Sequence, residues 1–350
     1  SQDTSVQGVE LNGDGTKMYV IGFQNDKIYQ YDISGVIYDE KQKLTAPTPA
    51  ANLAFGESVS VDDRGTKIIV GERYYNSQQG RAHVYRKVGS TWYFTKTIYA
   101  SNPTTDDGYG EHVSLSGDGN KAIIGSKQED TTNGDSGMAY VWTAPAIAAG
   151  ATITQFNGSQ VKVRPTANNN QYDNFGDSLD ISKDGNYIIV GARNADNGGR
   201  SYIFKLTAGS WGQVDNSVVS GGSLTGYSVA IDGDGDTVLI GSPNAAAGGS
   251  NRGAVLVKTR SGNNWSNEAT LEADNKGDND WFGGSVAISD DGNTAVVGAY
   301  YEDTGGSGAG SAYVFTRSGT TWTQNFKIAI QLEEMNLVML LSLEMDLIFL

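Results

Sequence analysis

The stretch Phe282–Phe315 decides the fold: F-G-G-S-V-A-I-S-D-D-G-N-T-A-V-V-G-A-Y-Y-E-D-T-G-G-S-G-A-G-S-A-Y-V-F. Apolar and polar residues alternate before the D-D-G turn, again after it, and a third time after the glycine-rich loop, which indicates three β-strands. A further run, W-T-Q-N-F-K-I at Trp322–Ile328, predicts a fourth strand. Four antiparallel strands of this kind form one blade of a β-propeller.

The same unit repeats along the chain. The glycines of the turns lie at Gly15, Gly65, Gly119, Gly185, Gly235 and Gly292, with spacings of 50, 54, 66, 50 and 57 residues. The glycines of F-G or its equivalent lie at Gly56, Gly110, Gly176, Gly226 and Gly283, with spacings of 54, 66, 50 and 57. Because both series lengthen and shorten together, each unit behaves as one block. Four tryptophans begin fourth strands, and we expect them to pack between blades: Trp92, Trp211, Trp265 and Trp322.

We therefore predict an all-β fold, a β-propeller of four-stranded antiparallel blades over residues 1–329. Six units are readable, near residues 5–49, 50–103, 104–168, 169–220, 221–276 and 277–329. The third unit carries an insertion near 144–158, which explains its longer spacing.

Residues 330–350 are an anomalous tail, without glycine and rich in methionine. In a shifted frame, codons allowed for the segment that starts at Glu334 can spell D-E-F-G-N-A-V-V-I-R-D-G-F. The F-G and D-G of that string would fall roughly 54 residues after Gly283 and Gly292. We predict an out-of-frame seventh unit, so that six blades form an arc with an open edge. A docked amphipathic helix is the alternative, and a membrane span, which needs ~20 apolar residues, is too long for this tail.

Composition excludes several classes of function. The chain has 350 residues, with 40 Asp and Glu against 25 Lys and Arg and a net charge of -15. Nucleic acid and anionic lipid surfaces both call for a basic footprint. Cysteine is absent, which excludes disulfides and thiolate catalysis. The chain begins with Ser1 and shows no signal peptide, so we expect a processed product or part of a larger multidomain protein.

The pattern F-G-x-S-V-x-I-S-x-D-G-x-x-x-V-V-G-A, followed by G-x-A-Y-V-F and a tryptophan, resembles the FG-GAP repeats of integrin-α-type β-propellers. It is most similar to the bacterial variety with a short D-G turn. The resemblance covers roughly residues 50–328. It implies a propeller of usually seven blades in an extracellular or cell-surface adhesion or interaction protein.

The resemblance also implies calcium-binding loops of the form D-x-D-x-D-G-x-x-D. The best match is I-D-G-D-G-D-T-V-L-I, with Asp232, Asp234 and Asp236 as candidate ligands, but Thr237 and Ile240 occupy the last two positions. Calcium takes six to eight oxygen ligands, so the alternative is an ordinary hairpin turn with exposed carboxylates. The aspartates of D-x-[FY]-G are expected to cap the loop before the first strand of a blade: Asp107, Asp173 and Asp280.

The loops that follow V-G-A and those that precede F-G are expected to share one face of the propeller, which is the ligand face in integrin-like relatives. They carry aromatic residues that we take as ligand-face candidates: Tyr74, Tyr75, Trp281, Tyr300 and Tyr301. Exposed rings there could stack on sugars or anchor a protein partner. The alternative is that they pack against neighbouring loops.

Catalysis has no motif to support it. The two histidines, His83 and His112, lack metal-ligand spacing, and the chain has no G-x-S-x-G, H-E-x-x-H or P-loop sequence. We expect a non-catalytic extracellular binding or adhesion propeller that contacts a protein through its loops. The alternatives are a glycan-binding, lectin-like propeller and a structural spacer.

Overall fold

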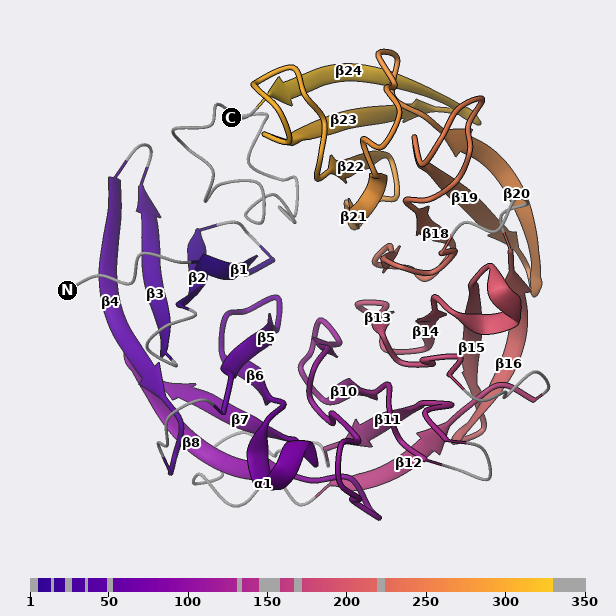
Figure 1. Cartoon of the computed structure of the whole chain (residues 1–350). Coiled ribbons are helices and arrows are strands. Elements are labelled where there is room, and N and C mark those ends of the chain that lie inside the picture. The colour runs from indigo at the N-terminus through magenta and orange to yellow at the C-terminus, as the bar shows by residue number, and fades with distance from the viewer. Residues whose placement is uncertain are drawn as a thin grey trace.

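The computed structural model describes residues 6–13, 16–22, 27–34, 37–48, 53–130, 134–144, 158–166, 172–218 and 224–329. Their strands form six four-stranded antiparallel sheets (Figure 1). This confirms the all-β propeller fold with six readable blades. The predicted seventh unit, in residues 330–350, lies outside the described residues, as does most of the third unit's insertion.

Each blade uses strands that are consecutive in the chain. The first blade consists of β1 (Val6–Leu11), β2 (Lys17–Gly22), β3 (Lys27–Ser34) and β4 (Ile37–Thr45). The second consists of β5 (Phe55–Val61), β6 (Lys67–Glu72), β7 (Arg81–Val88) and β8 (Thr91–Ile98). The third consists of β9 (Val113–Leu115), β10 (Lys121–Ser126), β11 (Met138–Thr143) and β12 (Ser159–Val163).

The remaining blades follow the same order. The fourth consists of β13 (Ser178–Ile181), β14 (Tyr187–Ala192), β15 (Arg200–Thr207) and β16 (Ser210–Ser217). The fifth consists of β17 (Val229–Ile231), β18 (Thr237–Ser242), β19 (Ala254–Ser261) and β20 (Asn264–Leu271). The sixth consists of β21 (Phe282–Ile288), β22 (Thr294–Ala299), β23 (Ser311–Ser318) and β24 (Thr321–Ala329). The first strand of each blade lies nearest the centre and the fourth lies outside (Figure 1).

The hydrophobic core lies between blades. In one cluster Ile69 and Val84 of the second blade pack with Tyr109 and Tyr140, which belong to the third. The four tryptophans of the fourth strands join such clusters, which confirms their predicted packing role: Trp92, Trp211, Trp265 and Trp322. Burial of large apolar side chains between sheets therefore holds neighbouring blades together.

The glycine in V-G-A or I-G-S, here called the V-G glycine, is an inter-blade contact. A β-carbon at Gly71, Gly125, Gly191 or Gly241 would lie 1.8, 2.2, 2.0 or 2.2 Å from the carbonyl oxygen of the F-G glycine in the next blade. No side chain fits at such a distance, so the close approach of blades requires glycine. At Gly298 of the sixth blade, the three nearest atoms among the described residues all belong to Ser285 of the same blade.

The described blades form an arc rather than a closed ring of contacts. Strand contacts pass in order from β1 to β5, β9, β13, β17 and β21, and the described strands make no comparable contact between the sixth blade and the first. Figure 1 shows these two blades on either side of a break in the described ribbon. On the sixth blade Val296, Ala312 and Val314 form a separate small cluster.

Candidate functional site

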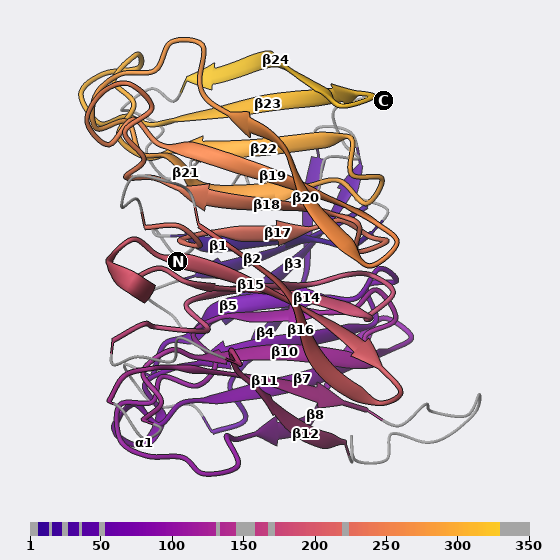
Figure 2. The ribbon, with the colours of Figure 1, turned by 90° about the vertical axis from the view of Figure 1, so that its right-hand side faces the viewer.

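The loops on one face of the arc are joined by backbone hydrogen bonds. Each loop that follows the second strand of a blade runs parallel to the loop that precedes the first strand of the next blade, through the bridges Gly80–Tyr109, Gly137–Phe175, Gly199–Thr225 and Gly253–Phe282. Between the second and third blades, the amide of Gly108 donates to the carbonyl of Gln78 over 2.8 Å. The short helices α1 (Tyr75–Gln78) and η1 (Ala195–Asn197) belong to these loops, at one edge of the side view in Figure 2. The loop face is therefore pre-organised.

One equivalent position has a left-handed backbone in every described loop that precedes the first strand of a blade. It is the residue immediately before the F, Y or T that precedes the F-G glycine, and we call it the pre-aromatic position. Its φ angles are 54° at Ala54, 67° at Gly108, 56° at Asn174, 55° at Leu224 and 59° at Trp281. Glycine and asparagine adopt this conformation readily, whereas it costs other residues roughly 1–2 kcal/mol. The Trp281 ring is thus held on the loop face at the expense of backbone strain, which is typical of functional sites.

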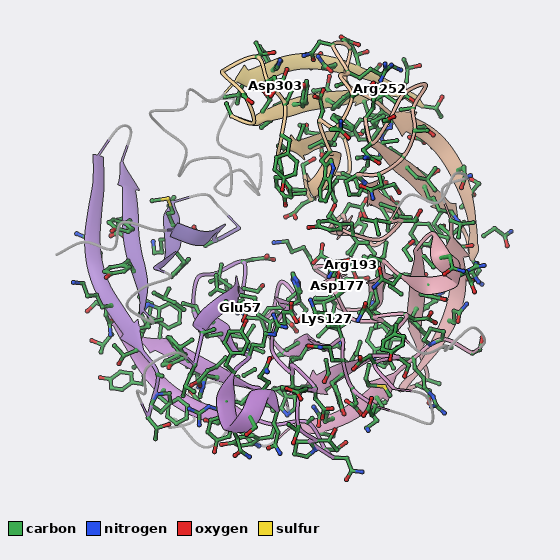
Figure 3. All side chains as sticks on the ribbon, in the orientation of Figure 1. Glu57, Lys127, Asp177, Arg193, Arg252 and Asp303 are labelled. Carbon is green, nitrogen blue, oxygen red and sulfur yellow. The ribbon has the colours of Figure 1, made fainter. Side chains whose placement is uncertain are left out.

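Two further positions place opposite charges around the centre of the ring. The residue after the F-G glycine is acidic and the second residue after the V-G glycine is basic in blades two to four. We call these six residues the charged arc: Glu57, Arg73, Glu111, Lys127, Asp177 and Arg193. Figure 3 labels four of them, Glu57, Lys127, Asp177 and Arg193.

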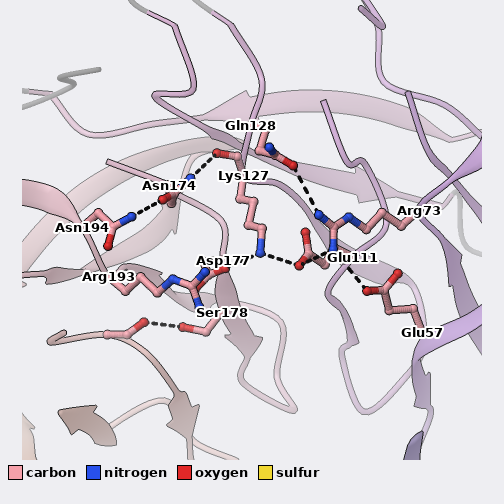
Figure 4. Close-up of polar contacts among 11 residues, drawn as sticks. Glu57, Arg73, Glu111, Lys127, Gln128, Asn174, Asp177, Ser178, Arg193 and Asn194 are labelled. Carbon is pink, nitrogen blue, oxygen red and sulfur yellow. Dashed lines mark hydrogen bonds and ion pairs between the residues drawn. The ribbon is translucent and has the colours of Figure 1, made fainter. Parts of the chain in front are cut away.

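Arg73 and Lys127 each pair with the acidic residue of their own blade and with that of the next blade (Figure 4). Arg73 Nη1 lies 3.4 Å from Glu57 Oε1 and 3.1 Å from Glu111 Oε1. Lys127 Nζ lies 2.5 Å from Glu111 Oε1 and 2.9 Å from Asp177 Oδ1. Burial and the negative charge of Glu111 raise the pKa of Glu57. The charged arc is therefore an alternating, mutually neutralised chain across blades.

Arg193 contacts both the last acidic residue of the charged arc and the first of the aromatic residues that follow it in blades five and six. Its Nε lies 3.1 Å from Asp177 Oδ2, and its guanidinium lies 5.4 Å from the ring centroid of Tyr227, which replaces the acid in the fifth blade. The Tyr227 ring lies 6.1 Å from Trp281, and Trp281 lies 5.3 Å from Tyr301 in an edge-to-face arrangement. With Tyr300, these residues form what we call the aromatic group: Tyr227, Trp281, Tyr300 and Tyr301.

Five residues of the charged arc and two of the aromatic group line a central cavity of about 580 Å³: Glu57, Glu111, Lys127, Asp177, Arg193, Tyr227 and Tyr300. Its walls are the first strands of blades two to six, with Lys183 and Asp290 at the end formed by the D-G turns. Asp180 joins three blades in this wall, accepting from Ser114 Oγ over 2.8 Å and from the Ile231 amide over 3.0 Å. Burial raises the pKa of Asp180. The cavity thus has a polar wall with built-in partners and a chemically varied mouth.

The structure separates the predicted aromatic ligand residues into two groups. Trp281 and Tyr301 come together, with 52% of Tyr301 exposed. Tyr300 turns toward the cavity and donates from its hydroxyl to the Gly284 carbonyl over 2.9 Å, and burial raises its pKa to about 12. The second blade holds Tyr74, 40% exposed beside Arg73, and Tyr75, which packs against other side chains.

Tyr75 covers a buried polar cluster. The Arg81 guanidinium lies 3.8 Å from its ring centroid, and the Tyr99 ring lies 5.9 Å away. Arg81 pairs through Nε with Glu72 Oε2 over 2.5 Å, and His83 contacts the same carboxylate. Burial lowers the pKa of His83. The Tyr75 and Tyr301 sites therefore differ, and the alternative of packing against neighbours applies to Tyr75.

The candidate calcium ligands lie in the D-G turn of the fifth blade. Asp232 is buried and accepts from the Asp236 amide over 2.8 Å, and burial raises its pKa to about 7. Asp236 Oδ1 accepts from Thr237 Oγ1 over 3.1 Å. Asp62 has the same turn role as Asp232, since it accepts from the Thr66 amide over 2.6 Å. Across the described ranges no group of three or more His, Cys, Asp or Glu side chains is arranged to hold a metal, and calcium at Asp232, Asp234 and Asp236 stays a prediction.

The expected capping aspartates are confirmed at two loops. Asp107 accepts from the Thr104 amide over 2.5 Å, and Asp280 accepts from the Gly277 amide over 2.6 Å. Asp173 is buried at the equivalent place. These carboxylates help to fix the loops that carry the pre-aromatic position.

Sequence reasoning missed the charged arc, although the repeat alignment contains it. In blades two to six, the residue after the F-G glycine is E, E, D, Y and G in that order. In the same blades, the second residue after the V-G glycine is R, K, R, P and Y. Complementary changes in two columns of a repeat are a signal of spatial contact. Comparing columns, and not only matching the motif, would have found the arc.

Comparisons with known proteins agree with this architecture. The FG-GAP repeat family matches residues 38–85, 92–142, 160–204 and 265–315. The structure is similar to the β-propeller domain of Cps50 (Swd1) from Myceliophteria thermophila, with a TM-score of 0.62, 10% identity, and coverage of 94% of this chain and 88% of that one. It is also similar to a protein from Lactobacillus plantarum, with a TM-score of 0.62, 15% identity and coverage of 95% and 86%. For Kuenenia stuttgartiensis hydrazine synthase the TM-score is 0.59, with 11% identity and coverage of 90% and 78%.

At these identities the likeness concerns the fold alone. No curated protein matches the sequence. Within the described part of the chain, none of the helices has the length and apolar character needed to cross a membrane. The four family matches span more than half of the residues, and each runs from the fourth strand of one blade through the first three strands of the next, so the chain belongs to the FG-GAP repeat family.

Proposed function

We propose that this propeller is a non-catalytic binding module that recognises a protein partner through its loop face, outside the cell or at the cell surface. The observation that carries the proposal is the edge-to-face pair of Trp281 and Tyr301, with Tyr301 52% exposed and Trp281 in a left-handed backbone conformation. FG-GAP repeats on a β-propeller suggest protein interaction, and the extracellular setting rests on the resemblance to integrin-α-type propellers.

The aromatic group has the properties of a binding hot spot. Tryptophan and tyrosine dominate such sites because they offer a large rigid surface with few rotatable bonds. The Tyr301 amide donates to the Asp280 carbonyl over 3.2 Å, and the Trp281 amide donates to the Asn251 carbonyl over 3.2 Å. Since the backbone on both sides is already fixed, binding costs less conformational entropy than it would on free loops.

The paired carboxylates of the charged arc and the buried His83 support a binding role over a catalytic one. The carboxylates of the charged arc are paired with Arg73, Lys127 and Arg193. His83 is fully buried beneath the loop face. A general acid or base needs to reach a proton on its substrate, and a paired or buried group is badly placed for that.

Paired substitutions test the proposal. Trp281→Gly removes the ring and suits the φ of 59°, and Tyr301→Ser removes its partner. Phe326→Ser is the matched control, because Phe326 is also 52% exposed but lies on the outer strand β24. Binding of the full chain is measured by interferometry on a panel of purified extracellular-matrix and surface proteins, in parallel with a glycan array.

We expect a protein ligand whose Kd rises at least about tenfold in Trp281→Gly and Tyr301→Ser, because a hot-spot aromatic contributes about 2 kcal/mol or more. Phe326→Ser should leave the Kd unchanged. Binding to sugars alone, lost in the same two variants, would overturn the proposal in favour of a lectin. Binding to nothing on either panel would favour a structural spacer.

A further inference from the structure

The charged arc ends on a base that has one acidic partner fewer than the other two. Arg73 and Lys127 each pair with two carboxylates. Among the described residues, the one salt bridge of Arg193 runs from Nε to Asp177 Oδ2, over 3.1 Å. The next blade would supply the second carboxylate, but Tyr227 occupies that position in blade five. The alternation of charge therefore stops one acid short.

The terminal nitrogens of Arg193 are accessible and unused. Neither Nη1 nor Nη2 makes a hydrogen bond within the described part of the chain, and neither is among the buried polar atoms that lack a partner, so both have access to solvent. The Arg193 side chain is 31% exposed and lines the central cavity. Its guanidinium lies over the Tyr227 ring, which leaves the N–H groups in the guanidinium plane available. Arg193 therefore offers a planar fork of donors at the cavity wall.

The side of Arg193 that faces blades five and six suits an anion with an apolar neighbour. The positions that correspond to the charged arc in those two blades hold no charged residue: Tyr227, Pro243, Gly284 and Tyr300. Asp177, on the other side of Arg193, shares its charge with Lys127, whose Nζ lies 2.9 Å from Oδ1. The Tyr227 ring lies 6.1 Å from that of Trp281, so the fork adjoins the aromatic group. We call the space between the Arg193 fork and Tyr227 the Arg193 site.

We propose that the Arg193 site binds one carboxylate, an Asp or Glu side chain presented by the partner of the loop face. The two oxygens of a carboxylate match the two Nη groups, which is the geometry in which arginine binds carboxylates most strongly. The bound acid would complete the alternation of charge, as Glu111 does for Arg73. That a partner presents the acid rests on the proposed function, whereas the chemistry of the Arg193 site does not.

Other polar groups fit this site less well. A carboxamide has a single acceptor oxygen and no charge. A phosphate dianion carries more negative charge than one guanidinium balances, since that guanidinium is already paired with Asp177. The site should therefore prefer a singly charged, planar anion.

Small probes test the site without knowledge of the partner. The full chain, labelled with ¹⁵N, is titrated with N-acetyl-glutamate amide, a glutamate with uncharged ends, and the Arg193 Nε–Hε and Tyr227 amide signals are followed by NMR. The corresponding glutamine derivative is the matched control, and inorganic phosphate is the third probe. We expect saturation by the glutamate probe with a Kd in the range of ~1–10 mM for so small a ligand, no saturation by the glutamine probe, and weaker binding of phosphate.

A pair of arginine substitutions localises the response. Arg193→Gln removes the fork but leaves Asp177 paired with Lys127, so the fold should persist while binding of the glutamate probe weakens at least about tenfold. Arg252→Gln is the matched control. Arg252 also pairs through Nε with one acid, Asp278, over 2.7 Å, and it is 27% exposed. Figure 3 shows Arg252 toward the outer side of the arc, away from Arg193, so this change should leave probe binding as it is.

Tyr227→Glu supplies the missing acid from within. The substitution gives blade five the residue that blades two and three carry at this position, Glu57 and Glu111. The new carboxylate should occupy the fork, so the glutamate probe should no longer saturate. If Tyr227→Glu does not fold, Arg193→Gln still decides the matter.

The outcomes separate this inference from the proposed function. Absence of saturation by the glutamate probe, equal saturation by the glutamine probe, phosphate binding as tight as that of the glutamate probe, or full binding to Arg193→Gln would each overturn the carboxylate site. Trp281→Gly should still bind the glutamate probe, because the fork belongs to blade four. Loss of a protein partner in Trp281→Gly together with no response to the probe would support the proposed function and reject this inference.

Discussion

The carbonyl oxygen of Gly226 lies 2.0 Å from the place that a β-carbon on Gly191 would occupy. The same oxygen accepts a hydrogen bond from Ser178 Oγ over 2.8 Å, so it cannot retreat without breaking that bond. Close contact between the fourth and fifth blades therefore requires glycine, which has no side chain, at position 191. The V-G glycines of the second, third and fifth blades repeat this relationship.

Gly191→Ala should lower the free energy of unfolding by about 1–3 kcal/mol or more, because the blades must separate to admit the methyl group. Gly212→Ala, in β16 of the same blade, is the control, since a β-carbon there has nothing within 4 Å. It should change stability by less than about 0.5 kcal/mol. Urea unfolding followed by tryptophan fluorescence measures both. Equal effects of the two substitutions would contradict the inter-blade role.

Lys127→Met should destabilise the protein by about 3 kcal/mol, because it removes the cation shared by Glu111 and Asp177, whose side chains are 9% and 4% exposed. Lys276→Met removes a more exposed pair with Glu272, in which both side chains are 34% exposed. That change should cost less than about 1 kcal/mol. The same urea experiment compares them, and a cost for Lys127→Met as small as that for Lys276→Met would show that the charged arc does not stabilise the fold.

Glu302 should make stability depend on acid pH. Although burial opposes it, hydrogen bonds from Lys327, Thr304 and Ser311 lower the pKa of this carboxyl from 4.5 to about 2. A depressed pKa gives stability that is present above the unfolded value and is lost as pH falls through the folded value. We expect about 2–3 kcal/mol to disappear between pH ~5 and ~2. In Glu302→Gln that loss should be missing from unfolding curves over this range, and an unchanged pH profile would refute the assignment.

His83 should also make stability depend on pH, in a higher range. Burial lowers its pKa from 6.5, so the unfolded chain takes up a proton more readily than the folded one. Stability is therefore complete above pH ~6.5 and falls as the pH drops below that value. Tyrosine occupies the equivalent position in three other blades: Tyr140, Tyr202 and Tyr313.

His83→Tyr should reduce the difference in unfolding free energy between pH 7.5 and 5.5. NMR titration of the imidazole gives the direct check. A His83 pKa above 6.5 would mean that attraction to Glu72 outweighs burial, and it would reverse the expected trend.

The tail prediction is tested on the gene. We expect the codons of residues 334–346, read in the shifted frame, to spell F-G and D-G. Sequencing of the genomic DNA and of the transcript decides this. Codons that spell neither dipeptide would reject the out-of-frame seventh unit and favour the alternative, a docked amphipathic helix.

Much of the fold could be predicted because its signals are local. Period-two alternation and Asp-Gly turns act over a few residues, so they locate strands wherever they recur. The charged arc depends on pairs such as Arg73 with Glu57 and with Glu111, which are 16 and 38 residues apart. Those contacts arise only once blades pack side by side, and no single motif contains them.

The aromatic candidates show the same limit. The Tyr pairs at positions 74–75 and 300–301 look equivalent in sequence, but Tyr75 covers Arg81 whereas Tyr301 packs against Trp281. What lies opposite each ring is set by the neighbouring loop. Sequence therefore predicted which loops carry aromatic rings, and packing decided which rings stay accessible.

The left-handed backbone of the pre-aromatic position has a consequence for how new specificities arise. Hydrogen bonds between main chains hold these loops, so the side chain at each such position can change without redrawing the path of the chain. Alanine, glycine, asparagine, leucine and tryptophan already occupy five of them at Ala54, Gly108, Asn174, Leu224 and Trp281. Evolution or a protein engineer can therefore change the side chain at one loop position in each of blades two to six, and so alter ligand specificity one residue at a time.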